Sequence, residues 1–211
     1  MDIAKMIDHT MLKADAPSEA IKRYCQEAKE HGFASVCVNS CHVPLVASEL
    51  KGSDVKTCCV VGFPLGAMLT SAKAFEASEA VKAGAQEVDM VINVGAIKDK
   101  NWDFVRSDIK AVVDSSSPSL VKVIIETCLL TGEEKEKACQ LSEEAGAAFV
   151  KTSTGFSTGG ATVEDVKLMK KAVGDRLQVK ASGGIRTPEF AKELAEAGAD
   201  RIGAGNGIIL L

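Results

Sequence analysis

The hydrophobic positions along the chain fall into short runs that alternate with longer amphipathic stretches. The short runs are apolar and rich in Val and Ile, which is typical of buried β-strands. Eight strands are predicted, over Met6–His9, Ala34–Asn39, Lys56–Phe63, Glu87–Asn93, Val121–Thr127, Phe149–Ser153, Gln178–Ser182 and Arg201–Ala204. Seven helices are predicted between them, over Pro17–His31, Val43–Leu50, Ser71–Ala83, Trp102–Asp114, Gly132–Ala145, Val163–Val173 and Pro188–Ala197.

A weak internal repeat supports this alternation of strand and helix. The segments 82–89, 144–151 and 196–203 each contain a helix end, a glycine and the start of a buried strand. Glycine accommodates the left-handed backbone that commonly ends a helix. Because no hairpin signal interrupts the alternation, the strands are predicted to be parallel and joined by right-handed crossovers.

Eight such units favour a closed (β/α)8 TIM barrel as a single domain over residues 1–211. An open, doubly wound sheet is the alternative, but that fold carries a glycine fingerprint after its first strand. The corresponding segment, Asp8 to Lys13, contains no glycine. Since the sequence stops at Leu211, we expect a barrel with a short or missing final helix.

Composition narrows the classes of function. The 211 residues include 25 Lys and Arg against 29 Asp and Glu, a formal net charge of −4, and only 4% are aromatic. Such a chain has neither the basic surface nor the stacking side chains that nucleic-acid binding requires. No apolar run approaches the ~18 residues of a membrane span, and no secretory signal is recognised. We therefore expect a cytoplasmic protein that binds neither nucleic acid nor membrane.

The cysteines raise the question of a metal site. Seven are present, an odd number, as expected for reduced thiols inside a cell. Cys37, Cys41 and His42 are spaced like metal ligands, but no second pair of ligands follows at a useful distance. Because metal sites need a fuller ligand set, we expect structural thiols here, with no metal and no other cofactor.

Charged residues inside otherwise apolar strands mark the candidate site, because function in such barrels collects at the carboxyl ends of strands. Lys151 and Lys180 end neighbouring strands at the same register, and Asp89 is predicted to face inward on the fourth strand. Lys122, Ile124 and Glu126 occupy every second position of the fifth strand and are expected to face inward as well. Either lysine alone is explained by a strand-end charge in solvent, but the coincidence favours a cluster. Two close ammonium groups suppress each other's charge, so one should be partly neutral near pH 7. A neutral lysine attacks carbonyl groups and forms a Schiff base.

Glycines near the ends of the last strands indicate an anion site. Gly183 and Gly184 follow the seventh strand, and the run Gly-Ala-Gly-Asn-Gly at 203–207 ends the eighth. The loops after these two strands commonly hold a phosphate, since glycine lets backbone N–H groups close on the anion. Thr154 and Gly155 are expected to contribute from the sixth strand. Plain glycine turns are the simpler alternative for each cluster taken alone.

Five segments together resemble the deoxyribose-phosphate aldolase family. They cover essentially the whole chain in order and are Asp8–Thr10, Glu87–Asn93, Val123–Thr127, Val150–Phe156 and Val179–Arg186. The pairing of Lys-Thr-Ser-Thr-Gly with Lys-x-x-Gly-Gly-Ile-Arg is highly specific. The resemblance implies a cytoplasmic class I aldolase on a (β/α)8 barrel that needs no metal. It would cleave 2-deoxy-D-ribose 5-phosphate reversibly to acetaldehyde and D-glyceraldehyde 3-phosphate, with homodimer the expected assembly.

The resemblance also assigns roles by position. Lys151 resembles the Schiff-base nucleophile, and Lys180 the second lysine, which lowers the pKa of the nucleophile and takes part in proton transfer. Asp89 resembles the acid/base that moves protons in the carbinolamine and enamine steps. The same interior would be lined, and a water relay ordered, by Asp8, Lys122 and Glu126.

The sequence departs from the family after the last strand. Members commonly carry small hydroxyl residues there, whereas this chain has Gly205 and Asn206, so a glycine N–H and an amide replace hydroxyl donors to the phosphate. The departure bears on the affinity for the phosphate and on its placement. Two alternatives remain for the function: another imine-forming barrel aldolase on a related sugar phosphate, and a non-catalytic barrel that binds phosphosugars. The second lysine argues against the first, and the cost of buried charges against the second.

Overall fold

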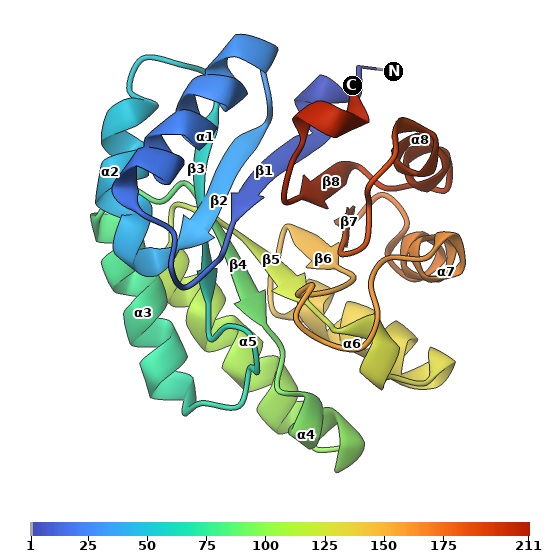
Figure 1. Cartoon of the computed structure of the whole chain (residues 1–211). Coiled ribbons are helices and arrows are strands. Elements are labelled where there is room, and N and C mark those ends of the chain that lie inside the picture. Colours follow the sequence, from blue (N-terminus) through green and yellow to red (C-terminus); the bar gives the residue numbers. More distant parts are fainter. Residues whose placement is uncertain (1) are drawn as a thin grey trace.

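Eight parallel strands close into a barrel, with the helices arranged around its outside (Figure 1). The computed structural model describes residues 2–211, so Met1 of the predicted domain lies outside the described residues. Each strand pairs with the next along the chain, and the last pairs with the first. The predicted (β/α)8 barrel is confirmed, and the doubly wound alternative is wrong. The strands are β1 (Ile7–Met11), β2 (Ser35–Asn39), β3 (Lys56–Val61), β4 (Glu87–Val91), β5 (Leu120–Ile124), β6 (Phe149–Lys151), β7 (Gln178–Ser182) and β8 (Arg201–Ala204).

All seven predicted helices are present, and one short helix was not predicted. The α-helices are α1 (Ser18–His31), α2 (Val43–Glu49), α3 (Thr70–Lys82), α4 (Val94–Lys98), α5 (Trp102–Ser116), α6 (Gly132–Glu144), α7 (Val163–Val173) and α8 (Pro188–Glu196). The 3-10 turns are η1 (Ala4–Met6), η2 (Ser40–His42), η3 (Thr127–Leu129) and η4 (Ile208–Leu210). After β8 the described chain forms only η4, in line with the short final helix expected. Within residues 2–211, no helix has the length and apolarity that crossing a bilayer requires.

Four predicted strands end two or three residues earlier than the apolar pattern indicates: β3 at Val61, β4 at Val91, β5 at Ile124 and β6 at Lys151. Strand β4 stops at Val91 because the Asn93 side chain accepts a hydrogen bond from the Ala96 N–H (3.0 Å) and so begins α4. Strand β5 stops at Ile124, and Glu126 adopts a left-handed backbone with φ of 55°. This conformation is uncommon for a residue with a side chain, and it breaks the alternation on which the inward position of Glu126 was predicted.

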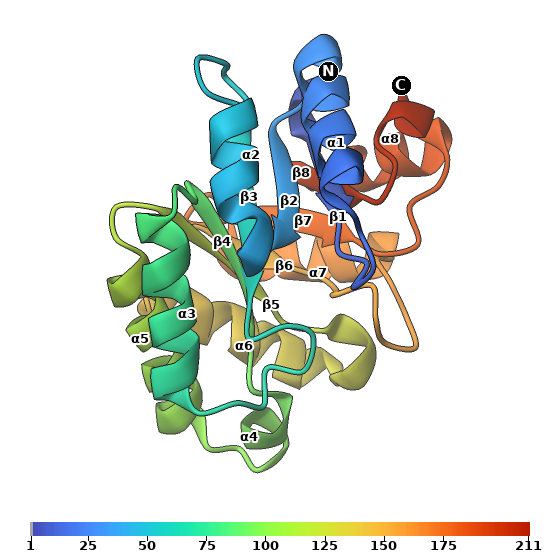
Figure 2. The same cartoon turned by 60° about the vertical axis from the view of Figure 1, so that its left-hand side comes forward.

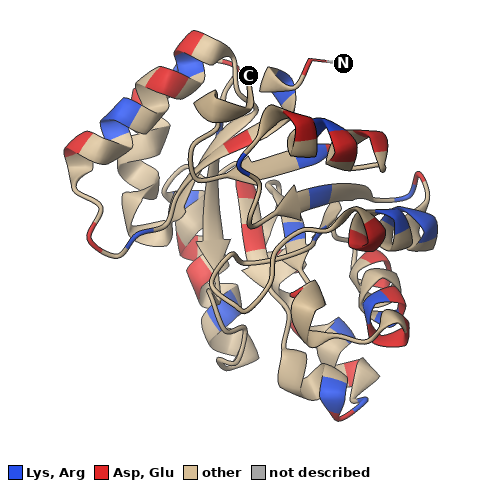
Figure 3. Ribbon diagram, turned by 45° about the vertical axis from the view of Figure 1, so that its right-hand side comes forward, with Lys and Arg blue, Asp and Glu red and all other residues tan. Residues whose placement is uncertain are grey.

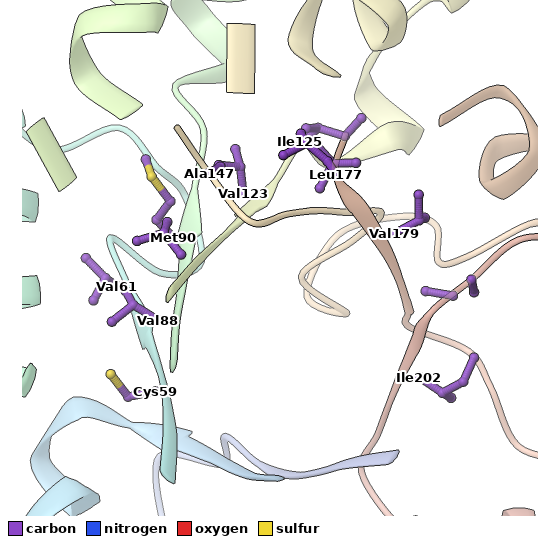
Figure 4. Close-up of a cluster of buried hydrophobic side chains, with 14 of the residues drawn as sticks. Cys59, Val61, Val88, Met90, Val123, Ile125, Ala147, Leu177, Val179 and Ile202 are labelled. Carbon is purple, nitrogen blue, oxygen red and sulfur yellow. The ribbon is translucent and has the colours of Figure 1, made fainter. Parts of the chain in front are cut away.

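The apolar core lies between the barrel and its helices. Outward-facing strand residues such as Val88, Met90 and Val123 belong to this core, and Figure 4 shows part of it. A separate small group of Cys37, Cys58 and Val60 lies inside the barrel. Because TIM-barrel interiors are commonly filled by branched apolar residues, the small size of this inner group leaves room for charged side chains.

The helices α3 and α5 pack side by side (Figure 2). A buried ion pair ties them to the end of β4. The Lys73 Nζ lies 2.7 Å from the Asp108 Oδ2 and donates to the Val91 carbonyl (3.1 Å). The Thr70 hydroxyl donates to the other oxygen of Asp108 (2.7 Å). Both charged side chains are fully buried. This cluster supports β4 two residues beyond Asp89.

The substitution Lys73→Met should lower the free energy of unfolding by about 3–5 kcal/mol, because Asp108 would keep a buried charge without its cation. Urea denaturation measures this change. The matched control is Lys110→Met on α5, whose ion pair with Asp114 (2.8 Å) is exposed and should leave stability nearly unchanged. Equal effects of the two substitutions would contradict the structural role of Lys73.

Candidate active site

Asp89 lies inside the barrel with three ammonium groups around its carboxylate. Its Oδ2 is 2.8 Å from the Nζ of Lys151 and 2.7 Å from that of Lys180. Its Oδ1 is 2.9 Å from the Nζ of Lys122. These four side chains come from β4, β5, β6 and β7, and none is more than 3% exposed. The inward alternation predicted for the strands therefore brings Asp89, Lys122, Lys151 and Lys180 together.

Two more carboxylates and an arginine complete this ion network. Asp8 lies 2.5 Å from the Nζ of Lys180 and also 2.5 Å from the Nη1 of Arg201. Glu87 pairs with the Nη2 of Arg201 (3.1 Å) and with the Nζ of Lys122 (2.5 Å). Figure 3 shows charged positions on the barrel strands as well as on the surrounding helices. The network thus sets three carboxylates against four cationic groups.

The network holds most of its members in their charged forms. Burial alone would raise the pKa of Asp89 and of Asp8, but the neighbouring ammonium groups outweigh it and keep each pKa well below its usual range. Burial alone would lower the pKa of Lys180 and Lys122, but the carboxylates of Asp8 and Asp89 raise both above the usual range. Neither Lys180 nor Lys122 is therefore the partly neutral lysine that the sequence predicts.

Of the described members of the network, only Lys151 lines a cavity, of about 290 Å³. The loops after β6, β7 and β8 form much of its wall. They contribute the predicted anion-binding residues Thr154, Gly155, Gly183, Gly184 and Gly205. The structure therefore brings the candidate nucleophile and most of the candidate phosphate contacts into one space.

Two of the predicted site residues, Asn206 and Glu126, form hydrogen bonds within loops instead of lining the cavity. The Asn206 Oδ1 accepts a hydrogen bond from the Ile208 N–H (3.1 Å), which supports the turn after β8. The Glu126 carboxylate accepts from the N–H (3.0 Å) and the hydroxyl (2.5 Å) of Thr154. Neither residue lines the cavity described above, and Glu126 is not brought into the ion network. Glu126 instead orients the loop after β6.

The cavity is also lined by four polar residues that were not predicted from the sequence as site residues, namely Thr10, Lys13, Tyr24 and Ser182. Ser182 stands two residues after Lys180, so alternation along β7 was a signal that could have found it. Tyr24 and Lys13 belong to α1 and to the loop before it, where no such signal exists. Their place at the cavity depends on how α1 packs.

The Ser182 hydroxyl stands out among these residues. It is 6% exposed and has no hydrogen-bond partner within residues 2–211. A Cβ atom at Gly203 would lie 2.3 Å from the Ser182 Oγ, so the glycine makes room for this hydroxyl. A buried hydroxyl without a hydrogen-bond partner lowers the stability of the protein. Such a hydroxyl is expected at a binding site, where the ligand supplies the missing partner.

The cysteines are arranged differently from the metal-like spacing in the sequence. Cys41 is exposed, whereas the Cys37 thiol is buried close to Cys58 and Asp89, their ligand atoms lying within 4.8 Å of one another. The Lys122 Nζ, however, bonds to both the Cys58 Sγ (3.4 Å) and the Asp89 Oδ1 (2.9 Å). An ammonium group thus already bonds to two of these three ligand atoms.

The model of the DeoC/LacD family aldolases matches residues 3–211. The chain belongs to this aldolase family. A deoxyribose-phosphate aldolase of Clostridium tetani is 61% identical over 209 residues, which cover 99% of this chain and 97% of that protein. One from Clostridium novyi is 61% identical over 212 residues, covering 100% and 96%.

Solved structures agree with this placement in the DeoC/LacD aldolase family. The aldolase QR15 superposes with a TM-score of 0.95 at 46% identity, covering 100% of this chain and 94% of that one. The deoxyribose phosphate aldolase from Aeropyrum pernix, described as tetrameric, superposes with a TM-score of 0.89 at 31% identity, covering 99% and 88%. The barrel is therefore that of a DeoC/LacD aldolase.

In this DeoC/LacD aldolase the substitution Ser182→Ala should lower kcat/KM for the aldol substrate about three- to tenfold, the effect of one hydrogen bond. The free energy of unfolding should stay constant or rise, because a buried hydroxyl without a partner is removed. Steady-state kinetics and urea denaturation measure the two quantities. The control is Thr127→Val, which removes another unpartnered buried hydroxyl that does not line this cavity and should leave kcat/KM constant. Wild-type kcat/KM in Ser182→Ala would rule out contact with the substrate.

Proposed function

We propose that the chain is a class I aldolase that cleaves 2-deoxy-D-ribose 5-phosphate reversibly to acetaldehyde and D-glyceraldehyde 3-phosphate. The observation that carries the proposal is Lys151, which is bonded to Asp89 inside the barrel and is the lysine of the network that opens onto the cavity. The relatives from the two Clostridium species, named for this activity, are 61% identical over nearly their whole length.

The arrangement of charges favours Lys151 as the nucleophile of the network. Its ion pair is with Asp89, and it shares the same carboxylate oxygen with Lys180. Lys122, Lys180 and Arg201 each pair with at least two carboxylates. A neutral Lys151 leaves three cations facing three carboxylates. A neutral amine in this place attacks an aldehyde carbon in the cavity.

The reaction follows from this nucleophile. The Lys151 nitrogen adds to the C1 aldehyde of the open-chain sugar, and the carbinolamine loses water to form an iminium ion. The C2–C3 bond then breaks, its electron pair moves toward the iminium nitrogen, and the C3 hydroxyl loses its proton as glyceraldehyde 3-phosphate forms. The resulting enamine takes a proton on carbon, and hydrolysis of the iminium releases acetaldehyde and the free lysine.

Asp89 and Lys180 lie beside the Lys151 nitrogen, at which this chemistry occurs. The Asp89 Oδ2 bonds to both lysines, so it connects them for proton transfer. Lys180 stays charged beside Lys151, because the carboxylates of Asp8 and Asp89 raise its pKa above the usual range. In this proposal Asp8 and Lys122 keep the two groups oriented, and the water relay predicted from the resemblance remains a prediction.

The substrate phosphate is assigned to the loops after β7 and β8. Gly183, Gly184 and Gly205 line the cavity there, where backbone N–H groups without side chains can approach an anion. Lys13 lines the same cavity and adds a positive charge. The amide of Asn206 is assigned to supporting the loop rather than to the phosphate, because its oxygen is bonded to the Ile208 N–H.

The proposal also covers the cellular compartment and the assembly of the enzyme. All seven cysteines are free thiols, which is consistent with the reducing cytoplasm. The homodimer expected from the resemblance remains a prediction, and the tetramer is described for the Aeropyrum pernix protein alone.

Incubation with 2-deoxyribose 5-phosphate or acetaldehyde, followed by borohydride, should leave a stable two-carbon adduct on Lys151. Borohydride reduces the iminium to a secondary amine, which peptide mapping by mass spectrometry locates. Lys98, exposed and paired with Glu134 on the surface, serves as the internal control and should stay unmodified. An adduct on another lysine, or none at all, would refute the proposed mechanism.

The substitution Lys180→Leu should reduce kcat by about 10²-fold or more, the usual effect of losing a group active in proton transfer. Lys180→Arg is the matched variant, because arginine keeps the charge but does not release a proton at neutral pH. We expect Lys180→Arg to retain borohydride trapping while its turnover stays low. Circular dichroism checks that each variant is folded, and near-normal kcat in the folded leucine variant at pH 7 would contradict the role of Lys180.

A further inference from the structure

The loop after β8, residues 205–207, is held by a buried histidine that the mechanism does not use. The Gly207 N–H donates a hydrogen bond to the His9 Nδ1 (3.1 Å). His9 lies on β1, fully buried, and its Nε2 donates to the Glu27 carboxylate on α1 (2.7 Å). With its proton on Nε2, the ring leaves Nδ1 free to accept from the loop.

The surroundings of His9 keep it in this neutral form. Burial lowers the pKa of His9 below its usual value, in spite of the hydrogen bond to Glu27, which raises it. His31 and Arg23, the other charged or titratable groups of α1 that act on the ring, lower the pKa further. At pH 7 the imidazole is therefore a hydrogen-bond acceptor toward Gly207.

Tyr24 holds the other end of the same loop. Its ring stacks on that of His9 with centroids 4.1 Å apart, and its hydroxyl donates to the Gly205 carbonyl (2.6 Å). The histidine and the tyrosine thus form one packed unit with a hydrogen bond to each end of the loop. Tyr24 lines the cavity, whereas His9 does not.

These two bonds set the rotation of both peptide planes of the loop. The plane between residues 205 and 206 is held through the Gly205 carbonyl, and the plane between 206 and 207 through the Gly207 N–H. Because a trans peptide points its C=O and N–H in opposite directions, holding one group orients the other. The direction of the Asn206 N–H is therefore determined by Tyr24.

The sequence at Gly207 is matched to this arrangement. A Cβ atom there would lie 2.5 Å from the Ile7 Cγ2 and 3.3 Å from the His9 Nδ1. The backbone at Gly207 has φ of −71°, which any residue adopts, so close approach rather than backbone freedom requires the glycine. A side chain at this position would collide with Ile7 and crowd the ring of His9.

We propose that His9 and Tyr24 are positioning residues that hold the loop 205–207 in the conformation that binds the phosphate of the substrate. The inference rests on the proposed function, in which this loop receives the phosphate. An anion site built from backbone N–H groups depends on their direction, because it has few charged side chains to compensate. His9, which lines no part of the cavity, acts on substrate preference through the loop alone.

The test compares 2-deoxyribose 5-phosphate with unphosphorylated 2-deoxyribose in His9→Leu, His9→Asn and the wild-type enzyme. His9→Leu should lower the ratio of kcat/KM for the phosphorylated sugar to kcat/KM for the unphosphorylated sugar about five- to tenfold. The change should come from a higher KM for the phosphorylated sugar. The Asn side-chain oxygen lies near the place of the Nδ1 and accepts from Gly207, so His9→Asn should recover most of the ratio. A merely structural defect would lower kcat/KM for both substrates alike and would not be rescued in this way, and such a result would overturn the inference.

Tyr24→Phe tests the second hydrogen bond and keeps the stacked ring. It should lower the same ratio about threefold to fivefold, and it decides the question by itself if His9→Leu fails to fold. The matched control is Lys22→Leu, which removes an exposed side chain of α1 that pairs with Glu19 (2.8 Å) and should leave the ratio constant. An unchanged ratio in Tyr24→Phe and folded His9→Leu would overturn the inference.

The same measurements separate this inference from the proposed function. If the wild-type enzyme forms the borohydride adduct on Lys151 but does not prefer the phosphorylated sugar, the aldolase chemistry stands and the positioning role is refuted. If no adduct forms and neither sugar is cleaved, the proposed function itself fails.

Discussion

The rest of the structure depends on one set of interactions, the hydrogen bonds that three buried ammonium groups donate to the carboxylate of Asp89. Taking so many charges out of water is costly unless each is paired. The barrel meets this condition with Asp8 on β1, Glu87 on β4 and Arg201 on β8, which complete the network. The favourable apolar burial is provided elsewhere, between the barrel and its helices, so the interior is left for chemistry.

Strands and loops divide the work of the site. The strands carry the lysines and carboxylates, whose positions are held by backbone pairing on both sides of each strand. The loops after β7 and β8 carry the glycines, and side chains of β1 and α1 hold the second of these loops from behind. Such a division gives the reacting nitrogen a rigid position while the anion is bound by backbone groups that need external support to keep their direction.

Much of the fold and the reacting centre could be predicted from the sequence, because the underlying signals are local. Alternation along single strands was enough to predict the inward positions of Asp89, Lys122 and Lys180, and strand–helix alternation was enough to predict the barrel. The same rule failed at Glu126, because a left-handed residue beyond Ile124 ended the alternation, and nothing in the apolar pattern marks that turn.

The sequence by itself determined the order of strands, the inward lysines and the glycine-rich ends, since each depends on neighbours within a few residues. Only the tertiary structure decided which lysine opens onto the cavity and which carboxylates keep the others charged. Only the tertiary structure places Tyr24 and His9 against the loop 205–207, from which they are separated by 181 and 198 residues along the chain. The physical reason is barrel closure: β8 pairs with β1 only when all the intervening units are in place, and no local pattern records that contact.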